Sequence, residues 1–259
     1  MFPKAKDLWK IHLETMKNNK IQDAIRHSIS ENNKSRKEYS LNHIYVYVLN
    51  DMKVPKEDSP PVSIAGVLET VKDILPRHLM QEVDSIYVGE FDIFEERDIN
   101  ALYDSGAIYV SNIQENIKDM VDDIVHEFAH SLETKFGSLI YGDGKLSREF
   151  LGKRRKLLLT MLSFDEFREV KKYIEHFKDT EFNEELDNYL SKEVGYPAIL
   201  NLTSEYLNTP YAITSLPEYY STGFEDYFID LKLREFLGTV SPALYKVLKT
   251  LELGETNGY

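Results

Sequence analysis

Two histidines and a glutamate form the most chemically suggestive group in the sequence. His126, Glu127 and His130 fit the pattern His-Glu-x-x-His. If this segment is helical, both imidazoles project from one face about 6 Å apart along the axis, a spacing that suits one Zn²⁺. Glu127 is rotated by about 100° from His126, so it can reach a water molecule beside the metal without being a ligand itself. The pattern is typical of metal-assisted hydrolysis with a carboxylate as general base.

The surrounding residues predict a long helix that would hold both histidines. Apolar residues recur every three or four positions from Ile113 to Phe136. Asn112 is placed to cap the start of this helix, and Gly137 to end it. A β-hairpin is predicted just before it, because the turn-forming residues 104–106 separate two short strand-forming runs. This setting favours a metal site over the alternative, a pair of partly exposed helix histidines.

The third metal ligand has three candidate carboxylates. Since the chain contains no cysteine, the ligand must be a histidine or a carboxylate. Glu133 lies on the same predicted helix as His130 and would point past the metal, so we expect an orienting or surface role. Glu218 begins a second predicted helix, residues 218–236, and could approach from the opposite side. Glu225 lies seven residues further along nearly the same face, and we favour Glu218 over it.

These motifs resemble the catalytic domain of anthrax lethal factor and the clostridial Pro-Pro endopeptidases. The resemblance rests on residues 126–130, on the acidic Glu133, and on Tyr211 and Glu218, which are seven residues apart. It covers roughly residues 85–236. What it implies is a zincin-like fold and zinc-dependent endopeptidase activity on a peptide or protein substrate.

The resemblance also implies a role for each matched residue. His126, His130 and Glu218 would hold the zinc ion. Glu127 would take a proton from the attacking water and pass it to the leaving amine. Tyr211 would donate a hydrogen bond to the developing oxyanion. Apart from the resemblance, Tyr211 is one of 17 tyrosines in the chain.

Two features depart from the family pattern. The family's second glutamate, four residues after the ligand, is Thr222 here, so Glu225 or water must take over its orienting role. The interval between His130 and Glu218 is long, and the excess is a charged helical block at about 145–200. The first departure, together with the missing secretion signal, favours an alternative function, a non-catalytic zincin-fold protein with a structural or host-interaction role. The intact general base weighs against that alternative.

The composition narrows the partners and the location. The chain has 44 acidic and 31 basic residues and a net charge of −13, which argues against binding to nucleic acid. The one basic cluster, residues 153–156, is too short to reverse this balance. The N-terminus shows no apolar signal segment, and no stretch approaches the roughly 18 unbroken apolar residues of a membrane span. We therefore expect a cytoplasmic protein without a nucleic-acid or membrane partner.

We predict a single α+β domain over residues 1–259. Residues 1–62 would supply a helical and strand part, residues 63–137 a small twisted sheet and the active-site helix, and residues 138–259 a mostly helical part with the third ligand. If residues 107–110 form the sheet edge, their backbone could pair with an extended peptide. The alternative is that another strand covers this edge.

Turn residues and apolar periodicity predict the remaining elements. Strands are expected at residues 44–49 and 86–88. Helices are expected within residues 5–35, over 63–75 and from 242 onward.

Overall fold

The α+β class is confirmed, since a five-stranded mixed sheet is combined with many helices. The structure, a computed structural model, describes residues 22–254 apart from 24, 31–36, 55–60 and 98. Contacts between Cα atoms divide the chain into two units. Unit 1 comprises Met1–Thr70 and Val83–Ile124, and unit 2 comprises Val71–Glu82 and Val125–Tyr259. The single-domain organisation stays a prediction.

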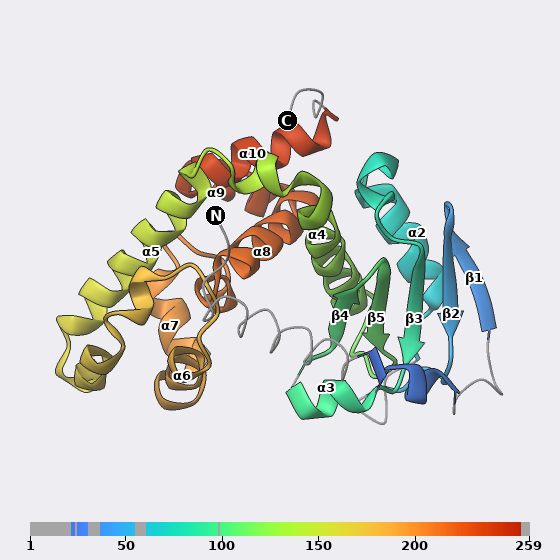
Figure 1. Ribbon diagram of the computed structural model, residues 1–259, viewed down its shortest axis with the longest axis horizontal. Helices are drawn as coiled ribbons and strands as arrows, with labels where there is room; N and C mark the ends of the chain where they lie inside the picture. Colours follow the sequence, from blue (N-terminus) through green and yellow to red (C-terminus); the bar gives the residue numbers. More distant parts are fainter. Residues whose placement is uncertain (1–21, 24, 31–36, 55–60, 98, 255–259) are drawn as a thin grey trace, which may run out of the picture. The chain divides into compact units, whose positions relative to one another are not determined.

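Unit 1 is built on the sheet, whose strands follow the order β1-β2-β3-β5-β4 (Figure 1). β2 and β3 are parallel, as are β3 and β5, whereas β1 and β4 are antiparallel to their neighbours. The strands predicted from the sequence are confirmed. β1 escapes prediction because four of its five residues are exposed and none is β-branched. The strands are β1 (Lys37–Leu41), β2 (Ile44–Val48), β3 (Ser85–Gly89), β4 (Ala101–Asp104) and β5 (Ala107–Ser111).

The predicted hairpin joins β4 to β5 through a two-residue turn. Ser105 and Gly106 both have positive φ, 49° and 85°, which matches the right-handed twist of an antiparallel pair. Of the two possibilities left open for residues 107–110, the sheet edge is wrong, because β5 pairs with β3 on one side and β4 on the other. The alternative, that another strand covers this edge, is confirmed.

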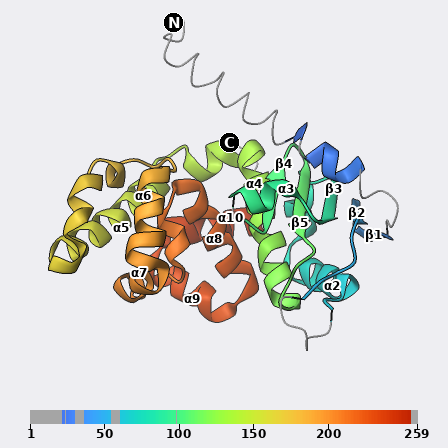
Figure 2. The same ribbon diagram turned by 90° about the horizontal axis from the view of Figure 1, so that it is seen from below.

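The two faces of the sheet carry different side chains. On one face Tyr47, Tyr87 and Tyr109 form a row with ring centroids 5.1 and 5.4 Å apart, and this row packs against a cluster that includes Ile25 and Phe91. Figure 2 shows α2 (Ile64–Ile74) on the opposite face. That face is aliphatic and almost fully buried, as expected for parallel strands covered on both sides. Its side chains are Val46, Val48, Ile86, Val88, Ile108 and Val110.

The long helix α4 (Ile117–Tyr141) starts later than the sequence predicts. Asn116 is its cap, because the Asp119 amide donates to Asn116 Oδ1 at 3.1 Å. The predicted cap, Asn112, instead donates from Nδ2 to the Asp51 carbonyl at 2.8 Å. The prediction of Asn112 as the cap is therefore wrong, since its side chain is committed to another loop.

The prediction that Gly137 ends α4 is also wrong. The helix continues to Tyr141 because the apolar spacing continues to Ile140, which is buried. Gly137 shows no positive φ, and a Cβ built there meets nothing within 4 Å, so an ordinary helical conformation suffices.

The rest of unit 2 is helical. The helix predicted over 218–236 divides at Asp230, whose carboxylate accepts from the amides of Lys232 and Leu233 and so caps a new helix. The last helix begins at Pro242, as predicted. α8 approaches α10 closely at Gly223, where a Cβ would lie 2.3 Å from Leu244 Cδ2. No helix in the described part of the chain is long and apolar enough to cross a membrane.

The helices have the following bounds. In order they are α2, η1 (Arg77–Met80), α3 (Asp92–Arg97), α4, α5 (Lys145–Leu162), η2 (Asp165–Tyr173), η3 (His176–Lys178), α6 (Glu184–Asn188), η4 (Tyr189–Gly195), α7 (Tyr196–Thr203), η5 (Pro210–Ile213), α8 (Leu216–Ile229), α9 (Leu231–Val240) and α10 (Pro242–Glu252). The helix predicted over 63–75 is confirmed as α2. Of the helices predicted within 5–35, residues 22–23 and 25–30 are helical, and most of the remainder lies outside the described residues.

Candidate metal centre

Helix α4 presents His126 and His130 side by side. The two ring centroids are 5.0 Å apart. Phe128 and Ala129, between them in the sequence, are fully buried and anchor this part of the helix. The imidazoles therefore project from one face of a well-anchored helix, as the four-residue spacing requires.

Helix α8 brings Glu218 to both imidazoles. Ser215 caps this helix, and its Oγ accepts from the Glu218 amide at 3.2 Å, which places Glu218 in the first turn. Glu218 Oε2 lies 3.1 Å from His126 Nε2 and 3.8 Å from His130 Nε2. One ligand atom from each of the three residues lies within 4.8 Å of the other two. Together these residues could hold a metal ion.

The remaining nitrogens of the two imidazoles are also held by carboxylates. His130 Nδ1 lies 2.8 Å from Glu133 Oε1, and His126 Nδ1 lies 3.5 Å from Glu225 Oε2. When the imidazoles are neutral, as ligation requires, a carboxylate at Nδ1 keeps the remaining proton there and leaves the Nε2 lone pair directed at the point that Glu218 approaches. Two imidazoles and one carboxylate, oriented in this way, form a donor set that fits a divalent transition metal.

The Thr222 hydroxyl, where the resemblance would place a second glutamate, donates to the Glu218 carbonyl at 2.7 Å and not to an imidazole. Glu225, one helical turn later, is the carboxylate that lies at Nδ1 of His126. Glu133 does not belong to the group formed by His126, His130 and Glu218. Its carboxylate contacts Nδ1 of His130. Glu133 and Glu225 thus lie at the Nδ1 atoms of the two imidazoles, and Glu218 lies on the Nε2 side of both.

Two further residues of the site are not found by sequence reasoning. Ser221 Oγ lies 3.0 Å from His126 Nε2 and 3.3 Å from Glu218 Oε2. The sequence feature that could have identified Ser221 is its three-residue spacing from Glu218, which places both residues on one face of α8. The Tyr141 hydroxyl donates to Glu133 Oε2 at 2.9 Å. That contact requires α4 to continue beyond Gly137, which the sequence does not predict.

Glu127 and Tyr211 lie close to this group. Glu127 is buried. After the larger effects of Glu133 and Glu218, its carboxylate adds to the raised pKa of His130, and after burial and Glu218 it adds to that of Tyr211. Tyr211 lies in η5, and its ring centroid is 6.4 Å from that of His126. Burial first, and then the nearby Glu218 carboxylate, raise the pKa of the Tyr211 hydroxyl, which therefore remains a proton donor at neutral pH.

The carboxylates and imidazoles of the site shift one another's pKa values. Burial alone would lower the pKa of His126, but hydrogen bonds to Glu218 and Glu225 outweigh burial and raise this pKa to about 9. Burial likewise opposes the charge on His130, yet hydrogen bonds to Glu133 and Glu218 raise its pKa well above the ordinary value. Burial would raise the pKa of Glu218, but the hydrogen bonds from the two imidazoles hold it well below its usual range. Without metal, these shifts favour a partly buried cluster of imidazolium and carboxylate groups.

We expect the metal-free protein to lose stability as the pH rises from about 6.5 to about 9. The folded state binds the His126 proton with a pKa of about 9 against an ordinary 6.5, so the stabilisation is complete below about pH 6.5 and is lost as the pH passes the folded-state value. Metal affinity should rise over the same range, because ligation displaces this proton.

Urea unfolding with a chelator present measures this loss. The free energy of unfolding should fall more between about pH 6.5 and about pH 9.5 in wild type than in His126→Gln. Equal losses in the two proteins would contradict the raised pKa of His126.

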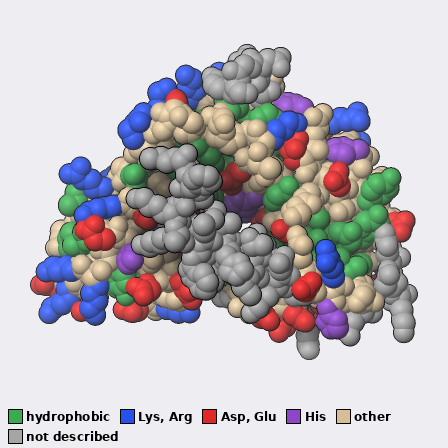
Figure 3. Space-filling model, in the orientation of Figure 1, with side chains coloured by type: hydrophobic (Ala, Val, Ile, Leu, Met, Phe, Trp, Pro, Cys, Tyr) green, Lys and Arg blue, Asp and Glu red, His purple; other side chains and the backbone are tan. Residues whose placement is uncertain are grey.

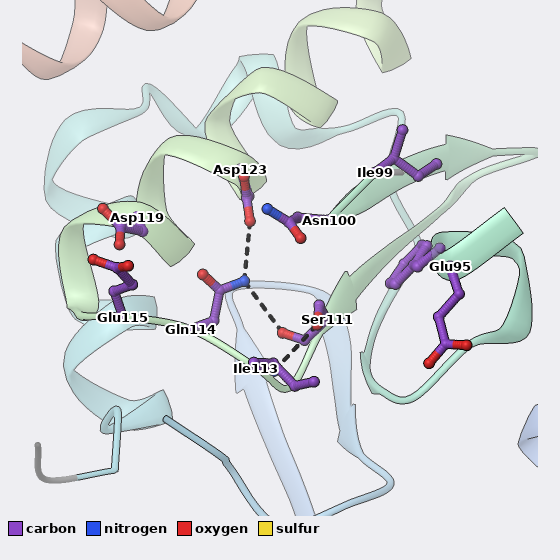
Figure 4. Close-up of a pocket in the computed structure, with 10 residues that line it drawn as sticks. Glu95, Ile99, Asn100, Ser111, Ile113, Gln114, Glu115, Asp119 and Asp123 are labelled. Atoms are coloured by element: carbon purple, nitrogen blue, oxygen red, sulfur yellow. Dashed lines mark hydrogen bonds between the residues drawn. The ribbon is translucent and has the colours of Figure 1, made fainter. Parts of the chain in front are cut away.

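A cavity of about 530 Å³ lies in unit 1 and is lined by ten residues, among which His126, His130 and Glu218 do not occur (Figure 4). Gln114 Nε2 donates to Asp123 Oδ2 at 3.0 Å and to the Ser111 carbonyl at 3.2 Å. These polar groups thus fix the loop that leads from β5 into α4.

Comparison with models of protein families, with curated proteins and with solved structures finds no match to this chain. The resemblance to lethal factor therefore stays a prediction that rests on the motif residues. The interpretation of the site rests on its geometry.

Proposed function

We propose that this chain is a zinc-dependent endopeptidase of zincin type, related to the lethal factor catalytic domain. One observation carries the proposal: one ligand atom each of His126, His130 and Glu218 lies within 4.8 Å of the other two, and Glu218 Oε2 approaches Nε2 of both histidines. These donors come from the two helices α4 and α8, and three protein ligands leave a fourth position open for water or substrate. The buried Glu127, adjacent to His126 in the sequence, supplies the carboxylate that distinguishes a hydrolytic site from a purely structural one.

Each residue of the chain has a defined task in this mechanism. Zinc, when bound, supplies a Lewis acid that polarises the scissile carbonyl and lowers the pKa of water. Glu127 takes a proton from the attacking water and delivers it to the leaving amine. Tyr211 donates a hydrogen bond to the oxygen on which negative charge develops. Glu133 and Glu225 keep His130 and His126 in the orientation for ligation.

A second candidate is a non-catalytic zincin-fold protein. It is favoured by one feature of the metal-free cluster: a carboxylate of Glu218, Glu133 or Glu225 lies within 4 Å of each nitrogen of both imidazoles. Such a cluster could serve structure alone. The two candidate functions differ in one measurable property: the endopeptidase turns over a peptide substrate and the non-catalytic protein does not.

Cleavage of a mixed peptide library by zinc-loaded protein tests the proposal, with Tyr211→Phe as the matched variant. Wild type should cleave a subset of peptides. Tyr211→Phe should cleave the same peptides about 10²- to 10³-fold more slowly, because it lacks the oxyanion donor, while binding as much zinc. Zinc content is measured on the same samples. Full zinc occupancy without cleavage across the library would favour the non-catalytic candidate.

A further inference from the structure

We propose that Arg154 is a positioning residue that fixes the segment 211–218, and thereby sets the places of Tyr211 and Glu218. The fixing of this segment stands on hydrogen bonds within unit 2, whereas its consequence for metal binding rests on the proposed function. Arg154 belongs to the charged block at about 145–200, which separates the two histidines from Glu218 in the sequence. That block holds the segment with the third ligand.

The basic cluster at residues 153–156 is not one surface patch. Lys153 and Arg154 are buried, at 6% and 0% exposure, whereas Arg155 and Lys156 are exposed. Figure 3 shows Lys and Arg side chains on the surface over α5, and the exposed half of the cluster belongs to that helix. Since burying a guanidinium is costly unless its donors are satisfied, the position of Arg154 calls for a structural reason.

The Arg154 guanidinium donates to four backbone carbonyls from two separate segments. Nε donates to Ile213 at 2.9 Å, and Nη2 donates to Thr214. Nη1 donates to His176 at 3.0 Å and to Asp179 at 2.6 Å. A planar fork with donors on three nitrogens can join two chain segments in this way, whereas a lysine ammonium cannot reach the same set.

Ile213 and Thr214 are the link between the two functional residues of the segment. Ile213 ends η5, which carries Tyr211, and Thr214 is followed directly by the cap residue of α8. The Thr214 amide and hydroxyl both donate back to the Tyr211 carbonyl, at 3.0 and 2.9 Å. A displacement of these carbonyls would therefore move Tyr211 and the first turn of α8 together.

A second contact ties the same two segments together. The Leu216 amide, at the start of α8, donates to the Thr180 carbonyl at 2.8 Å. Arg154 bonds to Asp179, the neighbouring residue. The stretch 176–180 thus supports the segment 211–218, and Arg154 closes the connection between them. Burial lowers the pKa of Arg154 only to about 10, so the guanidinium stays charged at neutral pH.

Lys153 offers a matched control for the loss of a buried cation. Its ammonium donates to the Tyr206 carbonyl at 2.6 Å and to the Val240 carbonyl at 2.9 Å. Neither carbonyl belongs to the segment 211–218. Lys153→Met should therefore destabilise the protein without specifically loosening that segment, and Arg155→Met removes a charge from the exposed half of the same cluster.

Hydrogen exchange in the metal-free protein tests the first part of the proposal. In Arg154→Met, peptides over residues 211–219 should exchange faster than in wild type, while peptides over 121–133 should not change. In Arg154→Lys, the exchange rate of these peptides should lie between those of wild type and Arg154→Met. This variant replaces Arg154→Met in the test if Arg154→Met does not fold. Arg155→Met should leave peptides over 211–219 as in wild type. Lys153→Met, whose ammonium also lies 5.7 Å from the ring centroid of Tyr219, should leave exchange over 211–218 as in wild type. Unchanged exchange of 211–219 in both Arg154 variants would overturn the proposal.

Titration with Co²⁺ tests the consequence for the metal site, because its visible spectrum reports the coordination. Arg154→Met should bind Co²⁺ about tenfold more weakly than wild type, with a spectrum shifted toward that of Glu218→Ala, and Arg154→Lys should recover part of both losses. A wild-type affinity and spectrum in Arg154→Met would overturn the positioning role. If wild type itself binds no Co²⁺, the proposed function fails, and the exchange result still decides whether Arg154 fixes the segment.

Discussion

Replacing Glu127 with glutamine is expected to slow peptide hydrolysis by about 10²- to 10⁴-fold and to leave zinc binding unchanged. Glutamine has nearly the same shape as glutamate but cannot accept the proton of the attacking water. The residues that could hold the metal are His126, His130 and Glu218. Glu127 is not among them, so its charge is not needed to bind the metal. Steady-state cleavage of a peptide selected from the library, with zinc content measured on the same samples, gives both quantities.

The matched control for this variant is Glu115→Gln. Glu115 lies near the start of α4 and lines the unit 1 cavity, so the same isosteric change is made outside the metal centre. This control should retain wild-type turnover. Wild-type turnover in Glu127→Gln would show that the general base has been assigned to the wrong residue.

The Glu218→Ala variant should show the largest loss of zinc affinity among carboxylate substitutions at the site. Glu218 is the carboxylate that approaches Nε2 of both histidines, so its removal leaves two protein ligands. Glu133→Gln and Glu225→Gln keep the shape at the outer nitrogens and should cost at most about 10- to 100-fold, the range of partners that orient a ligand. Competition with a chromophoric chelator measures all three affinities.

The order of these losses decides the third ligand. A larger loss in Glu225→Gln or Glu133→Gln than in Glu218→Ala would show that the ligand assignment is wrong. Circular dichroism of each metal-free variant shows whether a loss of affinity reflects the site or the fold.

The parts of the site that follow from local rules could be predicted from the sequence. A four-residue spacing within an apolar helical repeat is sufficient to place His126 and His130 on one face. Glu218 is expected to begin a helix, and it does lie in the first turn of α8, which Ser215 caps. The turn at Ser105 and Gly106 follows from residue types that tolerate positive φ.

The parts that depend on tertiary contacts could not be predicted. Residues 107–110 have the composition of a strand, but only the pairing with β4 shows that the strand is not an edge. Arg154 lies in a run of four basic residues that reads as a solvated surface, and its burial depends on carbonyls that are distant in the sequence. Tyr141 reaches Glu133 only because α4 extends beyond Gly137.

Anomalous diffraction at the zinc absorption edge, from crystals of the zinc-loaded protein, tests the central claim most directly. The account predicts one strong anomalous peak per chain, about 2.0 to 2.2 Å from Nε2 of His126, Nε2 of His130 and a carboxylate oxygen of Glu218. Nδ1 of each histidine should still face Glu225 or Glu133. A fully zinc-exposed crystal with no peak between these three residues, or with its main peak elsewhere, would contradict the account.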